Sequence, residues 1–243
     1  MEENNSSSSK GKLYLIPTPL GDYDPALALP APVLETIPTL RTFVVEEVRT
    51  ARRFLSAAGL RGRIQELEFH QLNEHTDPAD VERLAVLFDG GNDVGLLSEA
   101  GLPAVADPGA LLVSLCHRLD IEVVPLTGPS SLMLALMGSG LNGQSFAFAG
   151  YLPVKPEERR DAVRRLEKRS AAERQTQIFI ETPYRNDRML EDILATCSDS
   201  TLVTVAADLT LPSAFLRTLS VRQWKKAHVT IGKRPCVFLL LAR

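Results

Sequence analysis

The amino-acid sequence predicts an α/β protein of two domains. Short apolar runs alternate with segments of helical periodicity along most of the chain, a pattern typical of sheets covered by helices. The chain has 243 residues, which is enough for two domains of ordinary size. We expect an N-terminal α/β domain over residues 11–125 and a C-terminal α/β domain over residues 126–243.

The first ten residues, MEENNSSSSK, differ from the rest. They are polar and rich in serine, so we expect residues 1–10 to form a disordered tail. They lack the apolar core of a signal peptide, and no other stretch is apolar for long enough to cross a bilayer, which favours a cytoplasmic protein. The three cysteines stand far apart without metal-ligand spacing, so we expect buried thiols and no metal site.

In the N-terminal half, apolar runs predict strands at residues 13–16, 40–45, 93–98 and 122–126. Asp77 and Pro78 are typical of a helix start, and Gly90-Gly91 is typical of its end. A further helix is expected over residues 108–119.

The C-terminal half repeats the alternation. Helices are expected from residue 131 to about residue 138, near residues 157–173 and near residues 185–196. Strands are expected at residues 145–149, 177–181, 201–207 and 236–241, with a basic segment around Trp224 before the last of them.

Three loops follow apolar strands, at residues 17–22, 98–109 and 127–131. Their prolines, glycines and small residues would let a ligand approach the backbone, and open α/β sheets bind ligands at the carboxyl ends of strands. Each loop could equally be a structural turn or a helix cap, and Asp107 is an equally good N-cap. The chain has no G-x-G-x-x-G, Walker, H-E-x-x-H or G-x-S-x-G motif. A small-molecule cleft is therefore the most that these residues predict.

The charge is unevenly distributed. The net charge of −3 excludes a uniformly basic protein, yet residues 217–234 carry six Lys or Arg and no acid. Residues 155–174 carry eight basic and five acidic side chains, which indicates either a local basic surface or a solvated helix face.

The ordered set LSEAGLPAVADPG (residues 97–109), VPLTGPSS (124–131) and FAFAGYLP (146–153) resembles the tetrapyrrole (corrin/porphyrin) methylase superfamily. Within it, the chain is most similar to the ribosomal RNA small-subunit methyltransferase I group, which methylates a ribose hydroxyl of 16S rRNA. The resemblance implies a two-domain α/β fold with S-adenosylmethionine in a cleft between the domains, and a homodimer. It implies cofactor contacts from Pro19, Gly21, Glu99, Ala100, Gly101, Val105, Ser130, Ser131, Ile180, Glu181, Pro235 and Cys236.

The same resemblance places substrate-side residues at Glu46, Arg49, His70 and Asn73. Glu46, His70 or Glu74 would remove the proton of the hydroxyl, and Arg49 and Asn73 would position phosphate or ribose. These motifs match the group only in part, since Glu47 and Val48 replace its usual residues. Ribosomal RNA is the expected substrate and partner. A corrinoid or porphyrinoid methyltransferase, or a cofactor-binding protein that has lost catalysis, remain the alternatives.

Overall fold

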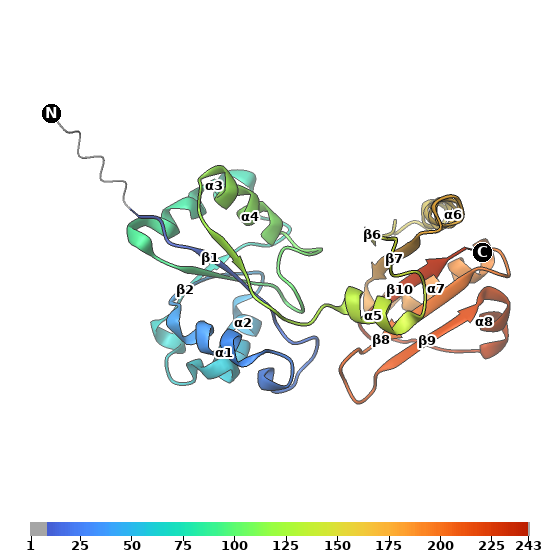
Figure 1. The fold of residues 1–243 in the computed structure, drawn as a ribbon, viewed down its shortest axis with the longest axis horizontal. Coiled ribbons are helices and arrows are strands. Elements are labelled where there is room, and N and C mark those ends of the chain that lie inside the picture. Colours follow the sequence, from blue (N-terminus) through green and yellow to red (C-terminus); the bar gives the residue numbers. More distant parts are fainter. Residues whose placement is uncertain (1–8, 243) are drawn as a thin grey trace. The chain divides into compact units, whose positions relative to one another are not determined.

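The structure is a computed structural model that describes residues 9–242, so residues 1–8 of the expected tail lie outside the described residues. The chain divides into two compact units between Pro129 and Ser130. We call residues 9–129 unit 1 and residues 130–242 unit 2 (Figure 1). The domain boundary expected after residue 125 falls in the same connection between the two units.

Unit 1 is built on a parallel sheet of five strands in the order β3-β2-β4-β1-β5. The strands are β1 (Leu13–Ile16), β2 (Thr42–Val45), β3 (Glu68–Gln71), β4 (Val94–Leu97) and β5 (Val123–Pro125). Every residue of β2 and β4 is buried, as expected for strands covered on both faces.

Helices cover both faces of this sheet. Helices α1 (Ala31–Thr36) and α2 (Val48–Leu55) pack on one face through Val33 and Leu55. The other face is covered by α3 (Pro78–Arg83), the 3-10 turn Leu84–Gly91 and α4 (Gly109–Arg118). The expected cap of α3 is present, since Asp77 accepts a hydrogen bond from the Ala79 N–H at 2.8 Å.

Strand β3 corrects the sequence prediction. The apolar runs predict no strand at residues 68–71, but His70 and Gln71 pair with Val44 and Val45 of β2. The segment EFHQ is an edge strand whose end residues are exposed, so it lacks the apolar pattern that marks the other strands. Its place in the sheet comes from backbone pairing with β2, which side-chain polarity does not reveal.

Unit 2 contains a mixed sheet in the order β6-β7-β10-β8-β9, in which only the β6–β7 pair is parallel. Its strands are β6 (Phe146–Tyr151), β7 (Thr176–Glu181), β8 (Leu202–Ala207), β9 (Phe215–Ser220) and β10 (Cys236–Leu241). Helix α5 (Ser131–Ser139) covers one face. Helices α6 (Pro156–Glu173), α7 (Asn186–Thr196) and α8 (Val221–Ala227) cover the other (Figure 1).

Two of these elements, β9 and α8, are absent from the sequence prediction, which has only a basic segment around Trp224. Ser220 and Gln223 form a reciprocal capping box at the start of α8. Trp224 is buried, and its Nε1–H donates to the Val203 carbonyl at 2.8 Å. The Ser-x-x-Gln spacing is typical of a helix start and could have predicted this helix from the sequence.

Within residues 9–242, no helix is both long enough and apolar enough to cross a bilayer. The three cysteines are buried free thiols, as the sequence predicts. Burial raises the pKa of the Cys116 thiol to about 11 and the pKa values of Cys197 and Cys236 to about 12.

We expect these thiols to react with a disulfide reagent such as DTNB at pH 8 only after unfolding in denaturant. The folded pKa values exceed the usual 9.0. The stability gained by keeping the thiols neutral is therefore present below pH 9.0 and is lost as the pH rises through the folded values. Rapid reaction of all three thiols in the native protein would contradict their burial.

Candidate active site

Three loops leave the same edge of the sheet in unit 1. They follow β4, β1 and β5, which are neighbours in the sheet. Thr18 and Gly101 form an antiparallel bridge, in which the Thr18 N–H donates to the Gly101 carbonyl at 2.9 Å and the Gly101 N–H donates back at 3.1 Å. The loop after β1 is therefore bound to the loop after β4, at the strand ends where open α/β sheets place ligands.

Two glycines allow this close approach. Gly101 has a φ of +82°, which favours glycine, and a side chain there would come within 3.2 Å of Leu20. At Gly128, a Cβ would lie 2.1 Å from the Cβ of Pro17, so the loop after β5 lies directly against the loop after β1. Within unit 1, which ends at Pro129, the three loops singled out in the sequence therefore lie against one another.

A cavity of about 270 Å³ opens beside these loops. It is lined by loop residues and by one side of α2; the lining includes Thr18, Pro19, Gly21, Tyr23, Thr50, Arg53, Phe54, Ala57, Ser98, Glu99 and Ala100. Four residues predicted to contact the cofactor, Pro19, Gly21, Glu99 and Ala100, are part of this lining. Val105 lies outside it and is 44% exposed.

Sequence reasoning missed the contribution of α2. Thr50, Arg53 and Phe54 of α2, together with Ala57 in the helical turn that follows (Ser56–Leu60), line the cavity at intervals of three and four residues, which is the spacing of one helix face. Arg49 is exposed and lies outside the lining, whereas Arg53 lies 3.9 Å from Asp22. The periodicity of α2 could have identified this face once a cavity was expected there.

Glu99 lines the cavity, and a second carboxylate, that of Glu46, contacts its backbone. The Glu46 Oε2 accepts a hydrogen bond from the Glu99 N–H at 3.3 Å, and the Thr50 hydroxyl donates to Glu99 Oε1 at 2.6 Å. Burial raises the pKa of Glu46, and the negative charge of Asp107 raises it further. Glu46 is therefore a carboxylate that holds a proton more readily than an exposed glutamate.

Asp107 does more than cap a helix. Its Oδ1 accepts hydrogen bonds from the Gly109 N–H at 2.7 Å, in the first turn of α4, and from the Ala104 N–H at 2.9 Å. The second bond fixes a strained loop, because Ala104 and Ala106 have φ values of 64° and 63°. The Asp107 Oδ2 and the Ser98 hydroxyl are buried and have no partner among the described residues, and Ser98 is part of the cavity lining.

His70 and Asn73 are already engaged within unit 1. The His70 Nε2 lies 2.9 Å from Glu68 Oε1, on the edge strand. The Asn73 Oδ1 accepts a hydrogen bond from the His75 N–H and stabilises a turn. Neither lines the cavity, and only their remaining polar atoms could contact a substrate.

Unit 2 places its predicted cofactor residues at two locations. Ser130 caps α5 by accepting a hydrogen bond from the Met133 N–H at 3.4 Å, and Ser131 is the first residue of that helix. Ile180 lies on the sheet face that α5 covers, whereas Cys236 belongs to the core on the opposite face. The two strand-end residues therefore do not share a surface.

Glu181, Pro235 and Cys236 lie together where β7 ends and β10 begins. Cys236 stands opposite Glu181 in β7 and opposite Ala207 in β8. The Glu181 Oε1 accepts a hydrogen bond from the Arg185 Nη2 at 2.6 Å, while its buried Oε2 has no partner among the described residues. The turn after β8 is strained, with φ values of 50° at Asp208 and 75° at Thr210.

Comparison with known proteins identifies the family. The sequence model of the tetrapyrrole (corrin/porphyrin) methylases matches residues 12–222. The chain belongs to this family. It is 33% identical over 209 residues to a ribosomal RNA small subunit methyltransferase I of Escherichia coli O157:H7, covering 86% of this chain and 69% of the relative.

Further similarities agree with this assignment. A ribosomal RNA small subunit methyltransferase I of Xylella fastidiosa is 32% identical, over 84% of this chain and 70% of the relative. The methyltransferase CobJ has the same fold, with a TM-score of 0.62, 17% identity and coverage of 96% of this chain and 94% of CobJ. The uroporphyrin-III-C-methyltransferase of Thermus thermophilus has a TM-score of 0.56 at 19% identity, covering 95% of this chain and 92% of that protein.

This member of the tetrapyrrole methylase family is a methyltransferase, and its methyl donor is S-adenosylmethionine. The residues of unit 1 fit such a donor. Asp22 and Glu99 of the lining provide negative potential in the cavity, which favours a cationic ligand. The partnerless Asp107 Oδ2 and Ser98 hydroxyl could accept hydrogen bonds from an ammonium or a hydroxyl group.

Proposed function

We propose that this methyltransferase methylates a ribose 2'-hydroxyl of small-subunit ribosomal RNA. The observation that carries the proposal is the similarity to ribosomal RNA small subunit methyltransferase I over more than four-fifths of the chain. A half-buried glutamate beside the predicted donor cavity supports it, because a ribose hydroxyl is a weak nucleophile that benefits from a base.

When bound, S-adenosylmethionine supplies a methyl group on a positively charged sulfur. The protein then has to align the hydroxyl with that group and to accept its proton. We assign the proton to Glu46, whose raised pKa makes it a better base than an exposed carboxylate. Arg49, exposed on the first turn of α2, is proposed to hold a phosphate of the RNA.

The cofactor residues stay a proposal in both units. In unit 1 we propose Pro19, Gly21, Glu99, Ala100 and Gly101 as the residues that hold the donor, with Val105 covering it. In unit 2 we propose Ser130, Ser131, Ile180, Glu181, Pro235 and Cys236; Cys236 is buried in the core and would act through its backbone.

The test is methyl transfer with purified components. The protein is incubated with radiolabelled S-adenosylmethionine and with small ribosomal subunits from cells that lack the gene. We expect the label in ribose of the small-subunit RNA, and at least about a tenfold loss of kcat/KM with Arg49→Ala, which is the loss of one charged contact of about 1.4 kcal/mol. Label in a porphyrinoid, with none in RNA, would overturn the proposal.

We further propose that the protein acts in the cytoplasm, where ribosomal subunits are found, and that it forms a homodimer. Unit 2 has exposed apolar side chains that a second copy could cover, among them Met137 at 77% exposure and Met133 at 43%. Light scattering of the purified protein tests the dimer, and a mass of 26.6 kDa in solution would contradict it.

A further inference from the structure

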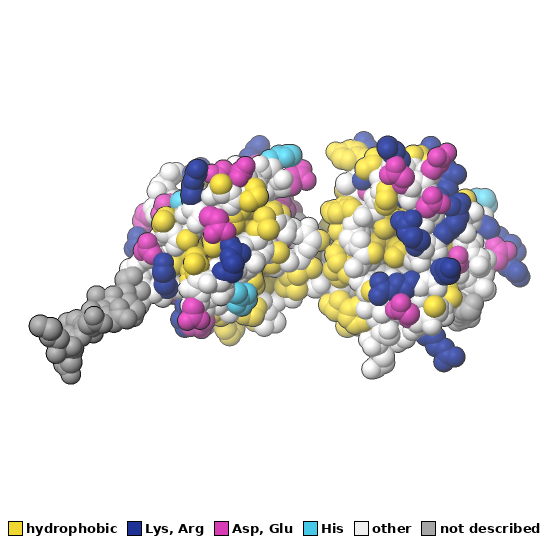
Figure 2. Space-filling model, turned by 90° about the horizontal axis from the view of Figure 1, so that it is seen from above, with side chains coloured by type: hydrophobic (Ala, Val, Ile, Leu, Met, Phe, Trp, Pro, Cys, Tyr) yellow, Lys and Arg dark blue, Asp and Glu magenta, His cyan; other side chains and the backbone are white. Residues whose placement is uncertain are grey.

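The two units carry opposite net charge. Residues 130–243 contain 17 Lys and Arg against 11 Asp and Glu, whereas residues 1–129 contain 10 against 19. Unit 2 is therefore basic although the whole chain has a net charge of −3. Figure 2 shows Lys and Arg side chains spread over unit 2, and such a surface attracts a polyanion.

Edge strand β6 presents aromatic rings on this basic unit. Phe146 is 40% exposed, Phe148 37% and Tyr151 57%. The register between β6 and β7 shifts between Phe148 and Tyr151, and Gly150 has a φ of +69°. This bulge turns the chain before Tyr151, as bulges at sheet edges commonly redirect a side chain.

The segment that follows, residues 152–155, ends in an exposed cation. Val154 is 62% exposed. The Lys155 side chain, at the N-cap of α6, is 79% exposed and forms an ion pair with Glu158. Exposed aromatic rings next to a cation are the combination by which proteins bind single-stranded RNA, since the ring stacks on an unpaired base and the cation meets a phosphate.

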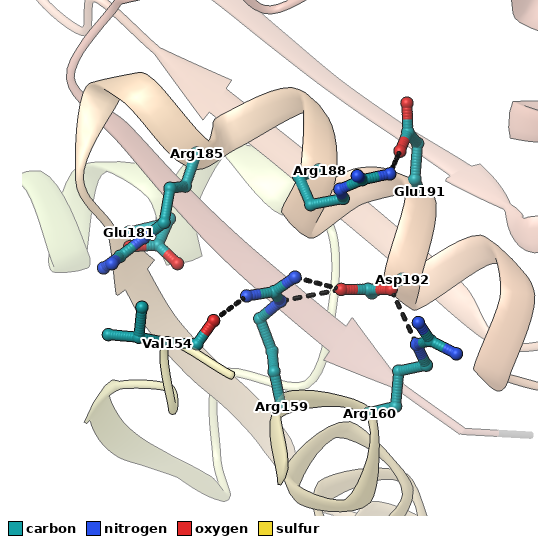
Figure 3. Close-up of polar contacts among 8 residues, drawn as sticks. All are labelled: Val154, Arg159, Arg160, Glu181, Arg185, Arg188, Glu191 and Asp192. Carbon is teal, nitrogen blue, oxygen red and sulfur yellow. Dashed lines mark hydrogen bonds and ion pairs between the residues drawn. The ribbon is translucent and has the colours of Figure 1, made fainter. Parts of the chain in front are cut away.

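A buried ion pair holds this segment in place (Figure 3). Arg159 is 2% exposed, and its guanidinium contacts Asp192 of α7 at 2.7 Å from Nε and 2.5 Å from Nη2. Its Nη1 donates to the Val154 carbonyl at 2.7 Å, and Arg160 adds a contact to Asp192 Oδ1 at 2.9 Å. Because the planar guanidinium of Arg159 binds Asp192 on one side and the Val154 carbonyl on the other, it fixes the backbone at Val154 against α7.

We propose that Tyr151 and Lys155 form an RNA-contact element, with Tyr151 stacking on an unpaired base and Lys155 pairing with a phosphate. Arg159 is its positioning residue, acting through the Val154 carbonyl. This inference rests on the proposed function and goes beyond it, because it names the surface of unit 2 that binds the RNA. The occupant is RNA because the excess of basic side chains on unit 2 is complementary to the phosphates of a polyanion.

The test measures KM and kcat for small ribosomal subunits, with donor binding followed separately by calorimetry. We expect Tyr151→Ala and Lys155→Ala each to raise the KM for subunits about tenfold, with kcat and donor affinity unchanged. Tyr151→Phe and Lys155→Arg are the matched controls and should keep the wild-type KM. Lys168→Ala removes an exposed lysine within α6 and should change KM less than twofold.

Arg159→Lys tests the positioning role, since it keeps the charge but cannot contact both Asp192 and Val154. We expect it to raise KM as Tyr151→Ala does, without adding to the effect of Tyr151→Ala in the double variant. Additive effects would overturn the positioning role. If Arg159→Lys does not fold, the KM values of the Tyr151 and Lys155 variants still test whether these two residues contact the RNA.

The outcomes separate this inference from the proposed function. If wild-type protein methylates no RNA, the proposed function fails. If wild-type protein is active and Tyr151→Ala keeps the wild-type KM, the contact element alone is wrong. It is also wrong if Lys168→Ala matches Lys155→Ala, which indicates diffuse attraction, or if Tyr151→Ala converts a dimer to a monomer, which indicates a second copy on this surface.

Discussion

Replacement of Glu46 by glutamine is expected to lower kcat for methyl transfer by about 100- to 10,000-fold, the usual contribution of a general base. Glutamine keeps the size of the side chain and its hydrogen bond from the Glu99 N–H, but it cannot accept a proton. Donor affinity and the free energy of unfolding should change little, so the loss would be in the chemical step.

The pH dependence gives a second readout of the same residue. Burial and the charge of Asp107 raise the pKa of Glu46 above 4.5, so the wild-type rate should fall as the pH drops through that raised value, where Glu46 becomes protonated. The Glu46→Gln variant should lack this limb. Glu47→Gln, the same change at the neighbouring N-cap of α2, is the matched control. Wild-type kcat in Glu46→Gln would remove Glu46 from the chemistry.

Replacement of Ala100 by leucine is expected to raise the Kd for S-adenosylmethionine about 10- to 100-fold. Ala100 lines the cavity of about 270 Å³ in unit 1, and the isobutyl side chain of leucine, three carbons larger, would occupy space that the donor needs. Overfilling a packed site typically costs about 1–3 kcal/mol, which corresponds to this range of affinity. Calorimetric titration with the donor measures the change.

Ala110→Leu is the control for this substitution, since Ala110 is exposed on α4 and lies outside the cavity. It should bind the donor with wild-type affinity. If Ala100→Leu also binds the donor normally, the cavity in unit 1 does not hold it, and the site has to be sought elsewhere in the chain.

Sequence reasoning located the loops of unit 1 because their signals are local. A buried parallel strand appears as a run of apolar residues, and the prolines and glycines that follow it mark where it ends. Pro19, Gly21, Glu99 and Ala100 were identified in this way together with the family resemblance, and all four line the cavity. The convergence of the loops follows from the strand order, which sequence pattern does not reveal.

Other parts of the site depend on contacts between distant segments. The hydrogen bond that the Ala104 N–H donates to Asp107 cannot be read from the sequence. An aspartate before a helix has the same sequence pattern whether or not it also fixes a loop. Thr50 was missed because its role depends on Glu99, which is far away in the chain. Strand β3 was missed because backbone pairing alone makes it a strand.

In unit 2 the ends of β7, β8 and β10 were predicted to within one residue, but not the faces on which their side chains lie. Neighbouring residues of a strand point to opposite faces, so Ile180 and Glu181 cannot both face one ligand surface. Ile180 lies with α5, and Glu181 binds Arg185. A motif that names consecutive residues does not show which of them points toward a ligand.

The most direct test of the account is a quantitative map of ribose methylation along the small-subunit ribosomal RNA, compared between cells with and without the gene. We predict that one ribose-methylated position disappears without the gene, returns with the wild-type gene, and does not return with Glu46→Gln. Identical maps with and without the gene would contradict RNA methylation by this protein.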